Sequence, residues 1–556
     1  MFRLFHRNVS RTKKLVLDTF FVPQNTRTDS LSTPILKREP HAIYFPRNFS
    51  LLEKRVREID SLTKFIFLKQ KQKALKCIVS TIFVVMIKHL LIFLLLANNT
   101  LFAQLDIFPI LPEKHNSFGY DMDLLPPQFH TKNRQALRDS MPKNTVAVIF
   151  ANPIRNRSND VNYEYHQDPN FYYLTGLREP NAVVFIFKEA QEFGNGMITD
   201  ELIFLQEKNA IDEKWTGKRL GTEGAIQYLK IKTALAGKDF SAFKMELETF
   251  DQVLITKQRE DISNNKEEGD LYSITNSFNL KTTKATLNDY KLSVIMASLR
   301  QIKSEEELFL MRKAITMTCD AQIELMKALK PGMKEYQSEA IIEYVFKKNG
   351  AEYPGFPSIL GGGENSCVLH YTSNRKTLTG KDLLVSDIGA EYHGYTADVT
   401  RTLPTDGHFS DEETIIYNIV LAAQQAGIDA CIAGNKFWDP HNAATKIIAE
   451  KLLALGIIDK KYKVRNYFMH GTSHYLGLDV HDQGLYAPLE IGNVITVEPG
   501  IYIPEGANCD PKWWNIGIRI EDDILITNGD PEVLSAKAPR TIKEIEALMK
   551  EVSNFE

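Results

Sequence analysis

The chain has 556 residues, of which 43% are hydrophobic and 25% are charged, and its formal net charge is -3. This is an ordinary globular composition, long enough for two or three domains, and it excludes a fibrous or wholly disordered protein. Residues 1–76 are basic and the rest of the chain is acidic, so the body of the protein lacks the charge pattern of nucleic-acid binding and we expect no nucleic-acid partner.

The first 85 residues carry no periodic pattern, and we assign this basic leader no fold. It runs into an apolar stretch at residues 77–97, which has the length of a membrane span. Lys88 near the middle of the stretch opposes that interpretation, because a central lysine costs about 2.5–3.5 kcal/mol on insertion scales. If these residues are an anchor, the positive segment 1–76 would lie on the cytoplasmic side.

A secretory signal peptide over residues 86–103 is the interpretation that fits better. Met86 and Lys88 would supply the positive start, an apolar core follows, and the small residue Ala103 precedes Gln104. We therefore expect translation to start at Met86, with export of the mature protein to a periplasmic or extracellular space. The membrane anchor is the alternative, and residues 1–85 would then be translated.

A smaller α/β domain is expected over residues 118–290. A helical pattern at residues 128–140 is followed by strand-like runs at residues 145–150, 182–187 and 202–205. Strands that alternate with helices indicate a mixed or parallel sheet. Polar loops are expected at residues 155–160 and 257–270.

The second domain, residues 291–556, opens with a helix. Ser304 can cap this helix and Glu307 can complete a capping box, while Pro331 and Gly332 stop it. Further helices are expected at residues 410–427 and 440–455. The strand-like runs between them predict an α+β domain in which helices cover one face of a curved antiparallel sheet.

A β-hairpin is predicted at residues 383–403, and it carries two carboxylates, Asp387 and Asp398. If Glu391 pairs with Gly394 across a tight turn, Asp387 lies opposite Asp398, and opposed residues share a face of the sheet. Two negative charges that close are destabilising unless a proton or a cation lies between them. The hairpin therefore predicts a metal site.

Candidate ligands continue after the hairpin. These are one histidine from among His470, His474 and His481, and the glutamates Glu498 and Glu521. Both glutamates lie inside strand-like apolar runs, where a bare carboxylate would be costly to bury. Together with the two aspartates they form an oxygen-rich set that suits a pair of Mn²⁺, Co²⁺, Zn²⁺ or Fe²⁺ ions and does not suit a structural zinc site. Two metals about 3.5–4 Å apart can activate a shared water and hold the oxyanion of a tetrahedral intermediate, as amide hydrolysis requires.

The order and spacing of these motifs resemble the Xaa-Pro aminopeptidases (aminopeptidase P), metallopeptidases of the pita-bread fold. The resemblance covers about residues 118–550 and includes segments 157–160 and 167–176 of the first domain. It implies a pita-bread catalytic domain and an enzyme that hydrolyses the N-terminal Xaa-Pro bond of peptides with proline at position 2. It leaves a homo-oligomeric state open.

The resemblance also implies the metal ligands. Asp387 would chelate one metal, Asp398 and Glu521 would bridge both, and His474 and Glu498 would hold the other. Two divalent metal ions are implied, with Mn²⁺ expected first and Co²⁺ or Zn²⁺ as alternatives.

Catalytic roles are implied in the same way. His370 and His481 match histidines that contact the substrate and steady the intermediate, and Glu498 would handle the proton of the bridging water. His470 matches a further active-site histidine, and Arg519, which we expect on the strand face of Glu521, matches an arginine beside the metals.

An Xaa-Pro dipeptidase (prolidase) is the alternative function. Prolidases carry a long insertion between the segments that correspond to Asp482 and Glu498, whereas fifteen residues intervene here. A non-catalytic pita-bread binding module is a more remote alternative, because binding alone would not require four acids in apolar strands.

Overall fold

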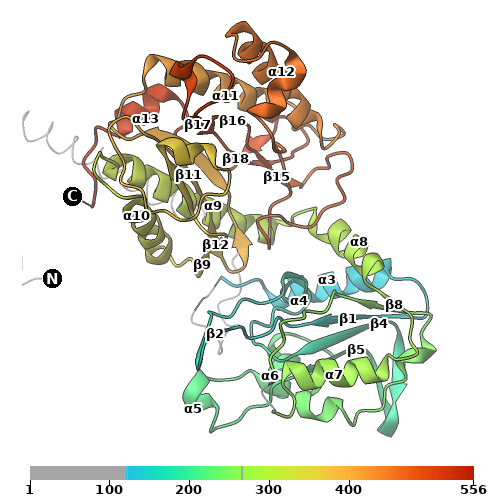
Figure 1. Ribbon diagram of the computed structural model, residues 1–556. Helices are drawn as coiled ribbons and strands as arrows, with labels where there is room; N and C mark the ends of the chain where they lie inside the picture. The colour runs from blue at the N-terminus through green and yellow to red at the C-terminus, as the bar shows by residue number, and fades with distance from the viewer. Residues whose placement is uncertain (1–120, 122, 265–266, 556) are drawn as a thin grey trace, which may run out of the picture. The chain divides into compact units, whose positions relative to one another are not determined.

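The structure is a computed structural model that describes residues 121, 123–264 and 267–555. The basic leader, the signal peptide and the alternative anchor expected at residues 1–103 lie outside the described residues. Within the described part of the chain, none of the helices combines the length and the apolar character needed to cross a membrane. Figure 1 shows two regions that each combine helices with a sheet.

The first region is a six-stranded sheet with helices on both faces. Its strand order is β6-β5-β4-β1-β7-β8. Strand β1 runs antiparallel to β4 and parallel to β7, which confirms the mixed α/β sheet expected from the sequence. The elements of this region are α3 (Pro127–Ser140), β1 (Thr145–Phe150), β2 (Asn156–Ser158), β3 (Val161–Asn162), α4 (Pro169–Thr175), β4 (Val183–Phe193), η1 (Gly194–Gly196), β5 (Met197–Leu205), α5 (Glu213–Thr216), α6 (Gly221–Tyr228), β6 (Thr233–Ala236), η2 (Gly237–Phe240), η3 (Leu247–Thr249), β7 (Gln252–Ile255), α7 (Leu271–Lys281), β8 (Leu287–Asn288) and α8 (Asp289–Arg300).

Strand β1 is buried along its whole length, which explains its unbroken apolar sequence. Val146 and Val148 belong to one hydrophobic cluster together with residues of α7, while Ala147 and Ile149 belong to another together with residues of α3 and α8. The side chains of a strand alternate between its two faces. Helix α7 therefore covers one face of the sheet, and α3 and α8 cover the other (Figure 1).

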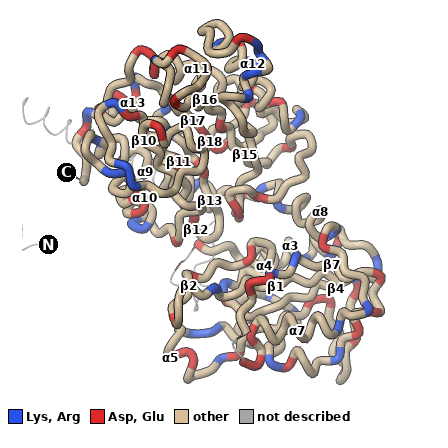
Figure 2. The backbone as a smooth tube through the Cα atoms, in the orientation of Figure 1, with Lys and Arg blue, Asp and Glu red and all other residues tan. Residues whose placement is uncertain are grey.

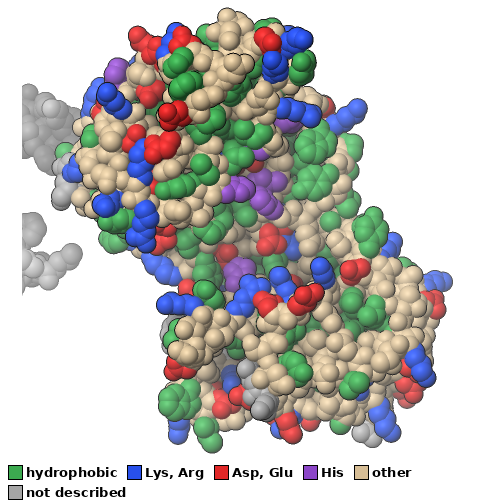
Figure 3. Space-filling model, in the orientation of Figure 1, with side chains coloured by type: hydrophobic (Ala, Val, Ile, Leu, Met, Phe, Trp, Pro, Cys, Tyr) green, Lys and Arg blue, Asp and Glu red, His purple; other side chains and the backbone are tan. Residues whose placement is uncertain are grey.

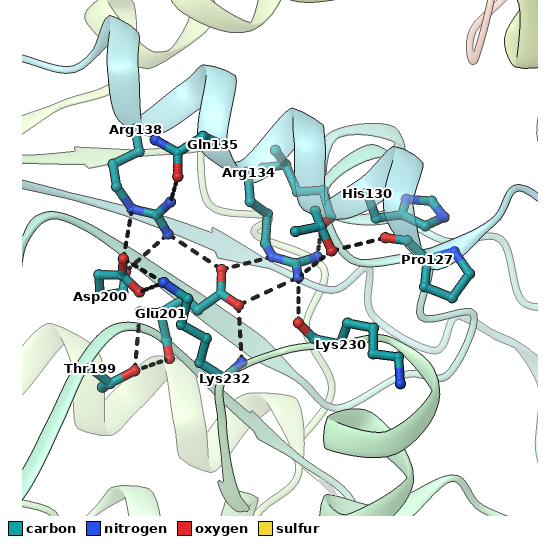
Figure 4. Close-up of polar contacts among 12 residues, drawn as sticks. Pro127, His130, Arg134, Gln135, Arg138, Thr199, Asp200, Glu201, Lys230 and Lys232 are labelled. Atoms are coloured by element: carbon teal, nitrogen blue, oxygen red, sulfur yellow. Dashed lines mark hydrogen bonds and ion pairs between the residues drawn. The ribbon is translucent and has the colours of Figure 1, made fainter.

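A buried ion cluster fixes α3 to the sheet (Figure 4). Arg134 Nε and Arg138 Nη2 both donate to Glu201 Oε2, at 2.9 and 3.3 Å, and the backbone N–H of Lys232 donates to Glu201 Oε1 at 2.9 Å. Arg134 and Glu201 are almost fully buried. Because every charge in the cluster has a partner, the desolvation cost of the carboxylate is offset by charge-assisted hydrogen bonds.

The polar loop expected at residues 155–160 is in fact a small hairpin. Strands β2 and β3 pair antiparallel around Asn159, whose φ is 51°. The prediction was wrong because exposed polar residues carry no alternating pattern, whereas asparagine tolerates the left-handed conformation that this turn needs.

The second region is the α+β domain expected from the sequence. Its elements are α9 (Glu305–Ala328), α10 (Glu335–Lys348), β9 (Tyr353–Pro354), β10 (Ile359–Gly362), η4 (Gly363–Cys367), β11 (Leu383–Ile388), β12 (Ala390–Tyr392), β13 (Tyr395–Thr396), β14 (Val399–Pro404), α11 (Asp411–Asp429), α12 (Asp439–Ala454), η5 (Lys461–Asn466), β15 (Val494–Val497), β16 (Gly500–Ile503), η6 (Pro511–Trp513), β17 (Ile516–Arg519), β18 (Asp522–Leu525), β19 (Glu532–Val533) and α13 (Ile542–Leu548). The capping boxes of α9 and α11 are present as predicted.

The strands of this domain form several small antiparallel sheets, where the sequence predicted one curved sheet. These are β10-β11-β14, β13-β12-β9, β15-β18-β19 and β16-β17. One break falls at Gly389, between β11 and β12. A Cβ atom at Gly389 would lie 1.8 Å from the carbonyl oxygen of Ala397. The two backbone segments therefore approach each other there too closely for any residue with a side chain, and the regular strand pairing is interrupted.

The predicted hairpin exists, but its register differs from the expected one by two residues. Tyr392 pairs with Tyr395 and Asp387 pairs with Thr400, so Asp398 is diagonal to Asp387 rather than opposite it. The turn is formed by His393 and Gly394, with φ values of 50° and 88°. A two-residue turn of this type needs positive φ at both positions. Glycine adopts positive φ easily, so the turn contains Gly394 instead of ending before it as predicted. A shift of two residues keeps both carboxylates on one face.

Candidate metal centre

Three predicted ligands converge in the second domain. One ligand atom each from Asp398, His474 and Glu521 lies within 4.8 Å of the others. Asp398 directly precedes β14, His474 lies in the segment before β15, and Glu521 lies between β17 and β18. In Figure 2 acidic positions are visible along β11 and β18 within this region. Three segments that are distant in sequence thus supply one cluster.

The imidazole of His474 is oriented as a ligand. Its Nδ1 is 3.1 Å from the carbonyl oxygen of Tyr475, so Nδ1 carries the proton and Nε2 is left as an acceptor. Nε2 lies 3.4 Å from Asp398 Oδ2 and 3.6 Å from Glu498 Oε1. Glu498 directly follows β15 and Glu521 directly precedes β18, so both lie at strand ends rather than inside strands as the sequence predicted.

Asp387, on β11, is the fifth predicted ligand. Its Oδ2 accepts a hydrogen bond of 2.6 Å from Arg519 Nη2. In the described part of the chain, Asp387 Oδ1 and Asp398 Oδ1 are buried oxygens without a hydrogen-bond partner. Buried carboxylate oxygens are normally paired or bound to a metal. The unpartnered oxygens and the free His474 Nε2 therefore fit a divalent cation.

Burial and mutual repulsion change the acidity of this group. Burial, followed by the charges of neighbouring carboxylates, raises the pKa of Asp398 and of Glu521 well above the usual range. Burial also raises the pKa of Glu498 to about 7, although His474 and Arg519 oppose the shift. A cation would relieve the same repulsion without protonation.

A second chain of contacts runs through His470. Its Nδ1 is 2.7 Å from the carbonyl oxygen of Gly471 and its Nε2 is 2.9 Å from the Tyr502 hydroxyl. Burial lowers the pKa of His470 to about 4, so the imidazole is neutral and Tyr502 donates to it. Arg519 Nη1 donates to the Tyr502 oxygen at 2.9 Å. Arg519, at the end of β17, therefore links His470 to the predicted ligand Asp387.

His370 and His481 are the two remaining predicted histidines of the site. The ring of His481 is 4.4 Å from that of His474, and both His370 and His481 are exposed. Burial, with smaller effects of His474 and His370, lowers the pKa of His481. Figure 3 shows histidine side chains gathered on the surface of this domain. His481 thus lies beside the predicted ligand His474, and the roles of His370 and His481 stay predictions.

Three residues of the site have no counterpart among the sequence predictions. Tyr502 joins His470 to Arg519, Thr400 contacts Glu521, and Asp523 Oδ2 accepts from the backbone N–H of Asp398. Thr400 and Asp523 lie two residues from a predicted ligand in the sequence, and Tyr502 lies four residues from one. This proximity in sequence is the signal that could have identified them. The residue types of Tyr502 and Thr400 do not separate them from core residues of a strand, whereas Asp523 is an acid within a buried strand and could have been noticed.

Similarity to known proteins agrees with this geometry. The model of metallopeptidase family M24 matches residues 310–528, and the model of the aminopeptidase P N-terminal domain matches residues 130–253. The chain belongs to metallopeptidase family M24.

Within that family its relatives are Xaa-Pro aminopeptidases. The protein of that name from Haemophilus influenzae is 34% identical, and the match covers 77% of this chain and 98% of the relative. The one from Escherichia coli is 36% identical over 75% and 96%. The solved structure of E. coli aminopeptidase P with the inhibitor Pro-Leu superposes with a TM-score of 0.69 at 35% identity, and covers 77% of this chain and 98% of that one.

These similarities decide between the functions expected from the sequence. The chain is a hydrolase of the Xaa-Pro aminopeptidase type with the pita-bread fold, and the prolidase alternative is not favoured. The non-catalytic binding module gains no support from these similarities, and three of the five predicted ligands, Asp398, His474 and Glu521, do lie together.

Proposed function

We propose that the protein releases the first residue of peptides that have proline at position 2 and are longer than two residues. Five ligands, Asp387, Asp398, His474, Glu498 and Glu521, would hold a pair of divalent ions. The observation that carries the proposal is the convergence of Asp398, His474 and Glu521 within 4.8 Å, in a chain whose relatives are Xaa-Pro aminopeptidases.

A bound metal pair would supply a water activated near neutral pH and an electrophile for the peptide carbonyl oxygen. Glu498 supplies the proton chemistry. As a carboxylate at the proposed metal centre, it would be able to accept a proton and to return it during the reaction. It can therefore take the proton of the attacking water and deliver a proton to the proline nitrogen that leaves.

His370 and His481, whose side chains are exposed, would assist the reaction. A neutral imidazole presents one N–H donor, and the lowered pKa of His481 favours the neutral form at neutral pH. Such a donor stabilises the oxygen of a tetrahedral intermediate as negative charge develops on it. Arg519 orients Asp387 and Tyr502.

We further propose Mn²⁺ as the metal, with Co²⁺ or Zn²⁺ as alternatives. Four carboxylates and one imidazole favour a hard or borderline divalent ion. Elemental analysis of protein purified without added metal would identify the ion and its stoichiometry, and the chelated enzyme should regain activity with that ion. A stoichiometry of zero in active protein would overturn the proposal.

The proposed activity is tested with peptides that differ in length and in the residue at position 2. Release of the first residue is compared for Xaa-Pro-Yaa, Xaa-Pro and Xaa-Ala-Yaa peptides at equal concentration. We expect cleavage of the first peptide, little cleavage of the dipeptide and none of the alanine control. Exclusive cleavage of Xaa-Pro would make the enzyme a dipeptidase and contradict the proposal.

A further inference from the structure

Thr400 lies at the back of the proposed metal centre, on strand β14. Its side chain is fully buried. Its hydroxyl oxygen is 2.6 Å from Glu521 Oε2 and 3.2 Å from Arg519 Nε. Asp387 is its cross-strand partner, so the hydroxyl is on the face of the sheet that carries the ligands.

The direction of these hydrogen bonds is fixed by chemistry. Arginine Nε is always a donor, so the Thr400 oxygen accepts from Arg519. The proton of the hydroxyl is then free to point to Glu521 Oε2, which a short distance of 2.6 Å to a carboxylate oxygen supports. Thr400 therefore links the guanidinium group of Arg519 to the carboxylate of Glu521 through one hydroxyl group.

No other hydrogen bond reaches the Glu521 carboxylate within the residues that the structure describes. The backbone of Glu521 is held separately, because its N–H donates to the Thr400 carbonyl oxygen at 3.1 Å and its carbonyl oxygen accepts from Arg401 Nη1 at 2.6 Å. The backbone contacts fix where Glu521 lies, whereas only the Thr400 hydroxyl fixes the rotation of its carboxylate.

We propose that Thr400 is a positioning residue for the carboxylate of Glu521, and so for metal binding. The inference rests on the metal centre proposed above. Metal ligands depend on partners that set their orientation, and loss of such a partner typically weakens metal affinity about 10–100-fold. Thr400 does not itself contact substrate or metal in this proposal.

Thr402 provides a matched control on the same strand and the same face. It is as fully buried as Thr400. Its hydroxyl donates to the backbone carbonyl oxygen of Arg519 at 2.9 Å and accepts from the backbone N–H of Arg519 at 3.1 Å. Loss of this hydroxyl removes two buried hydrogen bonds but leaves every ligand carboxylate with its partners.

The experiment compares Thr400→Val, Thr400→Ser and Thr402→Val with the unmodified enzyme. Each protein is stripped of metal, and Mn²⁺ binding is measured by isothermal titration calorimetry, with melting temperature and the separate values of kcat and KM for an Xaa-Pro-Yaa peptide. We expect Thr400→Val to weaken the affinity of the bridged site about 10–100-fold and to lower kcat at limiting metal, with KM little changed. Thr400→Ser keeps the hydroxyl and should restore the affinity to within about threefold, whereas Thr402→Val should melt earlier but bind Mn²⁺ normally.

Unchanged Mn²⁺ affinity in Thr400→Val would overturn the inference, and so would an equal loss in Thr402→Val, because the effect would then be general to the strand. If Thr400→Val does not fold, Thr400→Ala against Thr400→Ser gives the same comparison of proteins with and without the hydroxyl. If the unmodified enzyme binds no Mn²⁺, Co²⁺ or Zn²⁺, the metal centre itself fails, and the inference with it; this outcome is distinct from a failure that is limited to Thr400.

Discussion

Burial of the acidic residues at the proposed metal centre costs free energy, and a bound cation would offset that cost. Asp387, Asp398 and Glu521 are each less than a tenth exposed, and their charges repel one another. Desolvated carboxylates are stable only with a proton, a donor or a metal. The roles of the individual residues can therefore be separated by whether their loss removes the metal or only the rate.

We expect Asp387→Asn and Glu498→Gln to abolish turnover and to lose metal while the fold is retained, because each removes a ligand charge. His481→Ala should keep its metal and lose about 10²–10³-fold in kcat, the size expected for one oxyanion donor. Metal content by elemental analysis and kcat on an Xaa-Pro-Yaa peptide separate the two classes. Equal loss of metal in both classes would show that the roles are wrong.

Removal of the metal should make stability depend on pH. The folded pKa of Glu498 is raised to about 7 by burial, and those of Asp398 and Glu521 are also raised, so the folded metal-free protein binds more protons than the unfolded chain. The stability of the metal-free protein should fall as the pH rises from about 4.5 through the folded pKa of Glu498 at about 7, and should go on falling through the raised folded values of Asp398 and Glu521. Melting temperatures with and without Mn²⁺ across this range check the prediction, and parallel curves would contradict it.

At the scale of elements, the turn of the β12–β13 hairpin carries a buried charge cluster. His393 Nδ1 lies 2.8 Å from Glu352 Oε1 and Nε2 lies 3.0 Å from Asp123 Oδ1. With a carboxylate at each nitrogen, the imidazolium form is favoured. Burial lowers the pKa of His393, but the two carboxylates outweigh it and raise the pKa. Burial raises the pKa of Asp123, and hydrogen bonds from Lys313, Tyr392 and His393 outweigh it and lower the pKa to about 2.

His393→Asn should therefore destabilise the protein in a pH-dependent way. Asparagine accepts the positive φ of this turn, so the substitution removes the charge and keeps the backbone. A raised histidine pKa contributes stability that is fully present below about pH 6.5 and is lost as the pH rises through the folded value. The variant should melt about 1–3 °C earlier near pH 6, and the difference should shrink as the pH rises through the folded pKa of His393.

The matched control for this experiment is His408→Asn. His408 pairs with Glu546 but is largely exposed, so its ion pair should contribute little at any pH. Equal melting of His393→Asn and the unmodified protein near pH 6 would show that the cluster does not stabilise the hairpin.

The elements that could be predicted are those with local signals. Ser304 and Ser410 each begin a helix with a capping box, and both helices are present. Helix α10 was not predicted, because its N-cap is Lys334, which makes no side-chain cap hydrogen bond. The partition of the strands into small sheets depends on close contacts such as that at Gly389, which become visible only when the strands are assembled.

The residues of the candidate site also divide into those that the sequence could predict and those that it could not. The ligands could be proposed because acidic residues in apolar strands are unusual, and the resemblance gave their roles. Thr400 could not be proposed, because a threonine in a strand is common and its contact to Glu521 bridges 121 positions of sequence. Tyr502 was not distinguishable from an ordinary core tyrosine for the same reason.

At the scale of the molecule, the first domain contributes to the position of His481. Asp482, the next residue, forms a buried ion pair with Arg300 of α8 and accepts from Lys303 Nζ at 2.9 Å. Arg300 Nη1 also donates to Asn170 Oδ1 of α4 at 2.8 Å. Removal of one partner from a buried ion pair costs about 3–5 kcal/mol of stability, so this contact holds the segment that carries His481 firmly. Because Arg300 is itself bonded to Asn170, residues of both domains fix the position of this segment.

We also propose that the protein is exported, and this final prediction concerns the residues that precede both domains. If residues 1–85 are translated, the positive start of the signal peptide lies within an apolar run. If translation starts at Met86, Lys88 lies near the amino terminus, a short apolar core follows it, and Ala103 directly precedes the cleavage site. Leu101 is larger than the small residue usual three positions before the cut.

The test is amino-terminal sequencing of the native protein from the cell that makes it, with the soluble exported fraction and the membranes analysed separately. We expect the mature chain to begin at Gln104 and to be recovered from the exported fraction, because signal cleavage after Ala103 removes the apolar segment. Substitution of Met86 by leucine should abolish production if translation starts there, and should leave it unchanged if the upstream residues are translated. A chain that begins at Met1 and is recovered with the membranes would instead support the anchor at residues 77–97, with the basic segment on the cytoplasmic side.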